Sequence, residues 1–258
     1  MSREPLVSIC TVTYQRPGLL ELLEQRIHSQ TYPHNKTQWV ILDDSPEPHQ
    51  RYQKKTGDPA KPSIKYIHLP EKLPLGKKRN ESHLHCDGEI IVYMDDDDFY
   101  PPSRIQHAVD SLMDSEKEIA GSSTLPILCI DNADFSMSKS ISENHLSPGT
   151  FAFKRSYLEN HSYTEEDMFE EERDFLSNYT TPIIQLDPFQ TILCISHGSN
   201  TNKKYATPQK VGTDQSFIDN SREQTQLSET QRKVLNLIRD EYLAARADPD
   251  TTKTRYTF

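Results

Sequence analysis

The sequence predicts an α/β protein with a mostly parallel central sheet and helices on both of its faces. Segments of strand length alternate with segments of helical period over about the first half of the chain, which is the order that builds parallel strand-helix-strand units. Residues 90–94 are apolar throughout, as expected for a strand buried on both faces. Four aspartates follow directly, and Pro101 and Pro102 prevent the strand from continuing.

The strands of the first half are rich in β-branched and apolar residues, and the helices place apolar residues on one face. We expect strands at residues 6–14, 38–42, 64–69 and 89–94, with a loop over residues 47–63. We expect helices over residues 19–27, 76–86 and 102–113.

The second half has a weaker pattern. It predicts one or two strands within residues 119–130, a Ser-rich loop at 135–147, a strand at 150–153, an acidic helix at 164–179, and strands at 183–186 and 190–196 joined by a tight turn. Ser228 and Gln231 have the spacing of a capping box. They predict a C-terminal helix on which Val234, Leu237, Ile238 and Tyr242 pack.

Composition limits the class of protein. The chain has 258 residues and a net charge of −10, which argues against nonspecific binding to nucleic acid or to an anionic membrane. Its four cysteines are scattered and form no CxxC pair, so we expect free thiols and a reducing compartment. No apolar run reaches membrane-spanning length, and the N-terminus has no signal-peptide core. These features predict a cytoplasmic protein without membrane insertion.

Acidic side chains follow two of the predicted strands. Asp43 and Asp44 come after residues 39–42, and Asp95 to Asp98 come after residues 90–94. The carboxyl ends of parallel strands share one edge of a sheet, where open α/β folds bind their ligands. Adjacent carboxylates repel one another, and a hard cation with oxygen ligands removes that cost. The alternatives are a solvated acidic turn for the later group and ordinary turn chemistry for the earlier one.

A basic stretch lies between these two acidic groups. Lys77, Lys78 and Arg79 fall at the start of a predicted helix, where cations oppose the helix dipole. Free N–H groups at a helix start also bind anions, so a phosphate at this end accounts for both facts. The alternative is a solvated basic turn.

The order of these motifs resembles that of family 2 glycosyltransferases of the GT-A fold. The matching segments are residues 7–14, 40–45, 76–80 and 88–98, with thinner similarity at 171–176 and 196–200. The aspartate run and residues 78–80 are also similar to those of transferases from large algal viruses. The resemblance implies a GT-A (Rossmann-like) domain over residues 1–247 followed by a polar tail, 248–258. Within the domain, residues 1–115 would bind the nucleotide, 116–227 the acceptor, and 228–247 would form the C-terminal helix.

The resemblance also implies roles in nucleotide binding. Thr11, Thr13 and Tyr14 would line the nucleobase pocket. Asp43 would bind the base with support from Asp44. The nucleotide-binding set is completed by Lys78 and Arg79, near the base or diphosphate, and by Asp95 and Asp96, with Asp95 on the ribose side.

The cofactor implied by the resemblance is Mn²⁺ or Mg²⁺. The D-x-D motif of the family maps best on Asp95 and Asp97, with Asp97 holding the metal and Asp95 and Asp98 as alternative ligands. His197 resembles a late histidine of the family that contacts metal or diphosphate.

Inverting transfer requires a carboxylate that takes the proton of the acceptor hydroxyl. The family places an acidic pair before apolar residues near a helix start, which Glu171 and Glu172 match best. We therefore expect Glu172 to be the base, with Glu171, Asp167 and Asp174 as alternatives. Asp167 also fits a helix-capping pattern, which gives it a structural explanation.

The predicted function is metal-dependent transfer of a sugar, with inversion, from a nucleotide-diphosphate donor to a glycan or other hydroxyl acceptor. The donor is expected to be a UDP-sugar, and its sugar could be galactose, glucose, xylose or rhamnose. The expected location is the cytoplasm, of the host cell if the source is viral.

Three other classes of protein were considered. A sugar-nucleotide pyrophosphorylase would carry a Gly-rich loop where residues 13–18 stand, and a phosphatase would carry D-x-D after the first strand. A noncatalytic carbohydrate- or Ca²⁺-binding module would not need all these motifs together.

Overall fold

A computed structural model describes residues 4–53, 61–140, 142–165, 172–196, 222–224 and 228–247. In this part of the chain the larger sheet is made of β1 Val7–Thr13, β2 Thr37–Asp43, β3 Ser63–His68, β4 Ile90–Tyr93, β5 Ile119–Gly121, β8 Ala152–Lys154 and β9 Ile183–Gln185. Its order is β3-β2-β1-β4-β8-β5-β9. Only β8 runs against its neighbours β4 and β5 among these strands, so the prediction of a mostly parallel sheet is confirmed.

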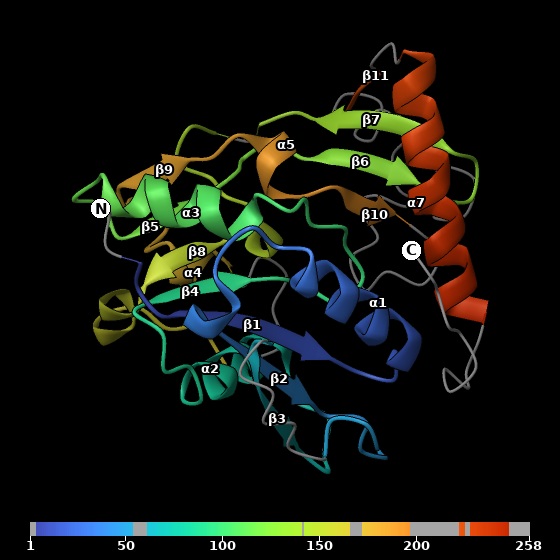
Figure 1. Ribbon diagram of the computed structural model, residues 1–258. Coiled ribbons are helices and arrows are strands. Elements are labelled where there is room, and N and C mark those ends of the chain that lie inside the picture. The colour runs from blue at the N-terminus through green and yellow to red at the C-terminus, as the bar shows by residue number, and fades with distance from the viewer. Residues whose placement is uncertain are drawn as a thin grey trace.

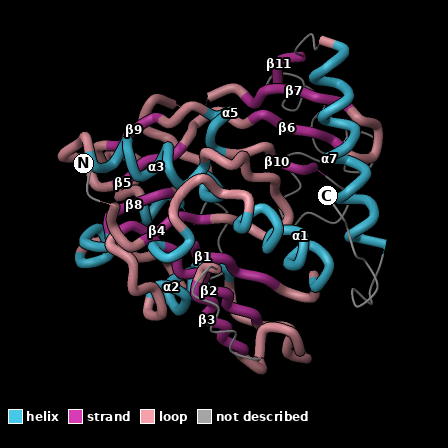
Figure 2. Tube along the Cα trace, viewed as in Figure 1, coloured by secondary structure: helices cyan, strands magenta, loops and turns pink. Residues whose placement is uncertain are grey.

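A second, smaller sheet lies beside the first (Figure 1). It contains β6 Pro126–Cys129, β7 Asp134–Ser138, β10 Cys194–Ser196 and β11 Arg222–Gln224 in the order β10-β6-β7-β11. The helices are α1 Pro17–His28, α2 Leu75–His83, α3 Arg104–Met113, α4 Glu172–Phe175, α5 Pro188–Thr191 and α7 Glu229–Ala247. Short 3₁₀ segments occur at His34–Lys36, Pro148–Thr150 and Arg155–Glu159. Figure 2 shows the helices placed around the strands.

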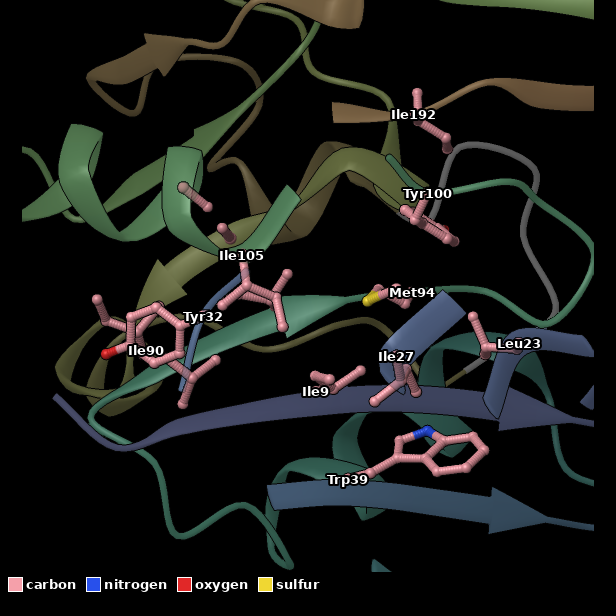
Figure 3. Packing of buried hydrophobic residues seen from close by; sticks show 14 of the residues in the cluster. Ile9, Leu23, Ile27, Tyr32, Trp39, Ile90, Met94, Tyr100, Ile105 and Ile192 are labelled. Atoms are coloured by element: carbon pink, nitrogen blue, oxygen red, sulfur yellow. The ribbon is translucent and has the colours of Figure 1, made fainter. Parts of the chain in front are cut away.

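The central strands are buried on both faces because their alternate residues enter two different cores. Ile9 and Trp39 pack with α1 and α3 on one face (Figure 3). Cys10 and Val40 pack on the other face in an aromatic-rich cluster that includes Phe175 of α4. This alternation explains why the strand sequences are apolar without a period of two.

A third core joins α7 to the smaller sheet. Ile238 and Tyr242 of α7 pack with Leu128 of β6 and with Leu19 and Leu22 of α1. The predicted capping box is present, since the Gln231 N–H donates to Ser228 Oγ at 3.3 Å and the Ser228 N–H donates to Gln231 Oε1 at 2.9 Å. No helix among the described residues is long and apolar enough to cross a bilayer.

The structure corrects the prediction for α7 and for the loop at 135–147. Val234 and Leu237, which were expected to pack, are more than half exposed, so the buried stripe of α7 is narrower than its apolar pattern. Residues 134–138 form strand β7, because Phe135 and Met137 alternate with serines and pair antiparallel with β6.

Two predictions between residues 164 and 196 are also corrected. Thr164 and Glu165 are not helical, and the helix in the described residues, α4, ends at Phe175. It ends there because Ser177, Asn178 and Tyr179 have φ of 49°, 54° and 60°.

The strand expected at 190–196 is shortened by α5, which Asp187 caps by accepting from the Phe189 N–H. Strands β9 and β10 belong to different sheets rather than to one hairpin.

We predict that Leu20→Ala lowers the free energy of unfolding by about 2–5 kcal/mol, because Leu20 is 1% exposed and its loss leaves a cavity between α1 and the sheet. Urea unfolding followed by the fluorescence of Trp39, the only tryptophan of the chain, measures this change. The matched control is Leu84→Ala, whose side chain is 76% exposed and whose loss should cost less than about 0.5 kcal/mol. Equal effects of the two variants would contradict the packing described above.

Candidate functional site

The carboxyl ends of β1, β2 and β4 bring the predicted residues together at one rim of the larger sheet. Thr13 at the end of β1 is in register with Asp43 at the end of β2. On the other side of β1, Cys10 is in register with Tyr93, so Asp95 follows just beyond the end of β4. The expectation that both acidic groups share a rim is therefore met by the topology.

The two carboxylates after β2 are held by donors from the protein itself. Asp43 Oδ1 accepts from the Ser45 N–H at 2.9 Å, and Asp43 Oδ2 accepts from the Tyr66 hydroxyl at 2.7 Å. Asp44 Oδ2 accepts from the Leu73 N–H at 2.9 Å, while Asp44 Oδ1 forms an ion pair with Lys78 Nζ. Both aspartates are buried, so their carboxylates have fixed orientations.

The predicted pocket residues on β1 have different environments. Thr11 is buried, and its hydroxyl donates to Met94 O at 2.7 Å and accepts from Trp39 Nε1 at 3.0 Å. Its side chain therefore ties β1 to β2 and to the end of β4. Tyr14 is half-buried, with Lys72 Nζ 4.3 Å from the centre of its ring.

The basic start of α2 is mostly buried, in contrast to the exposed turn that was the alternative interpretation. Lys78 donates to Thr13 O at 2.8 Å, and burial lowers its pKa. The Arg79 guanidinium lies 4.6 Å from the centre of the Tyr93 ring and 3.4 Å from Asp95 Oδ1. Lys77 is the exposed member of the group. Carboxylates and aromatic rings thus offset the unfavourable position of these cations at a helix start.

The four aspartates after β4 fall into two alternating pairs. Asp96 and Asp98 are buried, and burial together with the neighbouring charge of Asp97 raises the pKa of Asp96 to about 7 and that of Asp98 well above its usual range. The side chains of Asp95 and Asp97 are 21% and 16% exposed. This alternation favours Asp95 and Asp97 as the pair that can meet a ligand.

Protein donors hold the two buried members of the run. Asp96 Oδ2 accepts from the Thr13 hydroxyl at 2.6 Å and Asp96 Oδ1 accepts from Arg16 Nη1 at 2.9 Å. Asp98 Oδ1 accepts from the Ile195 N–H of β10 at 2.8 Å. Through this oxygen, Asp98 joins the rim to the smaller sheet.

Gly149 allows the 3₁₀ segment Pro148–Thr150 to approach the aspartates. A Cβ atom at this position would lie 3.1 Å from Asp95 Oδ2 and 3.6 Å from Asp98 Oδ2. Tyr100 closes the same corner, since its hydroxyl accepts from the Asp95 N–H at 2.7 Å.

The candidate base Glu172 is buried in α4. Its Oε1 lies 3.5 Å from Nε2 of His145, which is also buried, and Tyr179 packs against the His145 ring. The alternative Asp174 is exposed and lies beside Arg173. The other candidates, Glu171, Asp167 and His197, lie outside the described residues.

The donor set of the rim is suited to a hard divalent cation. Its ligand atoms are carboxylate oxygens, which Mn²⁺ and Mg²⁺ prefer. Burial is the main cause of the raised pKa values of Asp96 and Asp98, and the neighbouring charge of Asp97 adds to it. Among the residues that the structure describes, no three histidines, cysteines or carboxylates form a complete metal-binding group, so further ligands would come from a substrate, from water or from residues outside these ranges.

Sequence reasoning did not assign functional roles to Arg16, His145 and Gly149. Arg16 belongs to a stretch interpreted only as a strand breaker, and His145 lies in a segment interpreted as a loop. The chemistry of Arg16 and His145 depends on partners about 80 and 27 positions away in the chain. A single sequence contains no signal that pairs them.

Comparisons with known proteins agree with this arrangement. The family model described as glycosyl transferase family 2 matches residues 8–182. No curated protein matches the sequence.

The fold is similar to that of the mannosyltransferase PcManGT from Pyrobaculum calidifontis, solved in complex with GDP-Man and Mn²⁺. The TM-score is 0.59 at 15% identity, over 98% of this chain and 77% of that one. It is also similar to S. aureus TarS 1–349, with a TM-score of 0.57 at 17% identity, over 96% of this chain and 75% of that one. Solved structures of the same TarS fragment contain UDP and UDP-GlcNAc. Because the family model spans more than half of the chain, and the fold is that of GT-A enzymes, the protein belongs to glycosyl transferase family 2 and is a glycosyltransferase.

Proposed function

We propose that this glycosyltransferase moves a sugar from a UDP-sugar to a glycan or other hydroxyl acceptor, with inversion, and that it requires Mn²⁺ or Mg²⁺. The observation that carries the proposal is the shared rim. Asp43 and Asp44 lie at the carboxyl end of β2, Asp95 and Asp97 lie beyond that of β4, and Arg79 of α2 contacts Asp95. Residues 1–115 supply the donor site, and residues 116–227 contribute the acceptor side.

We place the nucleobase, the ribose and the diphosphate of the donor one after another along the rim. The nucleobase lies near Tyr14 and Asp43, where the fixed Asp43 carboxylate accepts from the imide N–H of uracil. The ribose lies beside Asp95. Arg79, already stacked on Tyr93, faces the diphosphate and neutralises part of its charge. The choice of UDP over GDP follows the family resemblance, and the complex of PcManGT with GDP-Man makes GDP the competing nucleotide to test.

Asp97 is the residue proposed to hold the divalent cation, with His197 as a second ligand. When bound, the cation stabilises the negative charge that develops on the leaving diphosphate. The complex of PcManGT with Mn²⁺ supports this assignment by analogy. The other residues of the rim orient the donor, because their side chains are already fixed by internal hydrogen bonds.

Glu172 is proposed to take the proton of the acceptor hydroxyl as the new glycosidic bond forms. His145, 3.5 Å from Glu172 Oε1, restricts the orientation of this carboxylate. Membership in a transferase family and the position of D-x-D after β4 leave the pyrophosphorylase, phosphatase and noncatalytic alternatives without a supporting observation.

We predict that chelation of divalent cations abolishes turnover of a UDP-sugar and that Mn²⁺ restores it. Asp97→Ala should have the same effect and leave the thermal unfolding temperature unchanged, because Asp97 lies on the rim and not in a core. Release of UDP from a panel of UDP- and GDP-sugars measures turnover. Asp110→Ala, on an exposed position of α3, is the matched control. Full activity in the presence of a chelator would remove the proposed metal requirement.

We predict that Arg79→Ala weakens binding of UDP by roughly 10- to 100-fold, the usual value of a hydrogen bond to a charged group. Titration calorimetry with UDP in the presence of Mn²⁺ measures this affinity. The matched control is Lys77→Ala, which removes a cation from the same helix start at an exposed position. If both variants bind UDP as well as the wild type, the basic stretch has no role in donor binding.

We predict that Glu172→Gln lowers turnover on the order of 10²–10⁴-fold, because the amide cannot accept the proton of the acceptor hydroxyl. The affinity for UDP should stay near that of the wild type, since Glu172 faces the acceptor. Steady-state transfer assays and UDP titrations separate these two effects.

Three variants on the same segment serve as controls: Glu171→Gln, Asp167→Asn and Asp174→Asn. If one of them loses transfer while Glu172→Gln keeps it, the base is a neighbour of Glu172. If none of the four variants affects transfer, the base lies on another segment.

A further inference from the structure

Among the residues that the structure describes, Arg16 makes the closest contacts between a cation and the aspartate run. Its Nη1 atom lies 2.9 Å from Asp96 Oδ1 and 2.7 Å from Asp97 Oδ2. One guanidinium nitrogen thus bridges two adjacent carboxylates. The donor-binding roles proposed above do not involve this residue.

The backbone on both sides of Arg16 is fixed by the fold. Gln15 has a left-handed φ of 53°, and its N–H donates to Ser45 Oγ at 2.7 Å. Arg16 is the N-cap residue of α1, where its carbonyl accepts from the Leu20 N–H at 3.0 Å. The turn between β1 and α1 therefore fixes the backbone of Arg16, and its side chain is only 24% exposed.

The two carboxylates that Arg16 bridges differ in their exposure to solvent. Asp96 is buried, and its second oxygen accepts from the Thr13 hydroxyl at 2.6 Å. Asp97 is more exposed, at 16% of its side-chain surface against 3% for Asp96. Of the two, Asp97 is the carboxylate that can turn toward a ligand while Asp96 stays with Arg16 and Thr13.

We propose that Arg16 is the internal counter-ion of Asp97 and competes with the divalent cation for its carboxylate. Arg16 holds Asp97 when no cation is bound, and it gives up Asp97 but keeps Asp96 when the cation binds. This inference rests on the proposed function through the role of Asp97 as a metal ligand. Arg16 is a positioning residue, because it acts on the cation site through the carboxylate.

The competition follows from charge and geometry. A guanidinium stays protonated at any pH at which the protein is folded, so its positive charge always opposes a cation at this site. A charge-assisted hydrogen bond of 2.7 Å must be broken before Asp97 Oδ2 can bind a metal. Replacing Arg16 by a neutral side chain removes both obstacles, and the site should then bind the cation more tightly.

The test is the affinity of the protein for Mn²⁺ alone, measured from the electron paramagnetic resonance signal of free Mn²⁺ without nucleotide. Arg16→Gln should bind Mn²⁺ roughly tenfold more tightly than the wild type, the factor expected for one charge-assisted hydrogen bond. Arg16→Met should behave in the same way and serves if the glutamine variant does not fold. Circular dichroism checks the fold of each variant.

The matched control is Arg51→Gln, which removes an arginine that pairs with Glu21 and Glu24. Its affinity for Mn²⁺ should equal that of the wild type. Wild-type or weaker affinity in folded Arg16→Gln and Arg16→Met would overturn the competition.

Asp97→Ala separates this inference from the proposed function. If Asp97→Ala loses Mn²⁺ binding while both Arg16 variants bind as the wild type does, only the role of Arg16 is wrong. If Asp97→Ala binds Mn²⁺ with wild-type affinity, the assignment of the metal ligand fails and the competition fails with it.

Discussion

The rim of this protein is organised around the cost of placing four carboxylates side by side at the end of a buried strand. Asp95 to Asp98 leave β4 where the sheet is covered on both faces, so solvent cannot screen their repulsion fully. Four donors from three segments offset this charge: Thr13 and Arg16 at the end of β1, Arg79 in α2, and the Ile195 N–H in β10. These contacts join the two halves of the chain, so the charge of the site and the arrangement of the fold depend on each other.

The other two acidic residues of the rim, Asp43 and Asp44, are also held by hydrogen-bond donors and a cation, which come from residues closer in the sequence. Asp43 and Asp44 each accept from donors nearby, and Lys78 links Asp44 to the end of β1. Carboxylates with fixed orientations need little reorganisation when a donor binds, which favours recognition of a rigid group such as a nucleobase. Asp97, after β4, differs in that a cation, Arg16, lies against its partly exposed carboxylate.

The parts of the fold that could be predicted from sequence are those set by local pattern. The apolar runs of β1, β2 and β4 and the apolar faces of α1 and α3 are buried in the structure, and the capping box at Ser228 forms as expected. The errors came where long-range pairing decides. Strand β7 exists because β6 lies beside it, and Leu237 is exposed because only one side of α7 meets the smaller sheet.

The same distinction applies to the site. The acidic and basic motifs could be recognised from their positions after strands and before a helix, since those positions place them at one rim. The partners of these motifs could not be recognised. Arg16 lies in a turn after a strand, and its contacts with Asp96 and Asp97 join residues about 80 positions apart in the chain. His145 meets Glu172 only because their two segments fold against each other.

The proposed acceptor side, around α4, consists of irregular backbone, unlike the strand ends that form the proposed donor site. Three consecutive residues after α4, Ser177 to Tyr179, have left-handed backbones, a conformation that costs non-glycine residues free energy and persists only where packing enforces it. Packing is present: Tyr179 lies against His145, and the Tyr157 hydroxyl donates to Phe175 O at 2.6 Å. The strained turn therefore helps to hold Glu172 and His145 in place. The proposed donor site thus lies at the end of a regular sheet, whereas the proposed acceptor side lies beside irregular backbone. This difference explains why the motifs of the chain indicate a nucleotide-sugar donor and do not identify the acceptor.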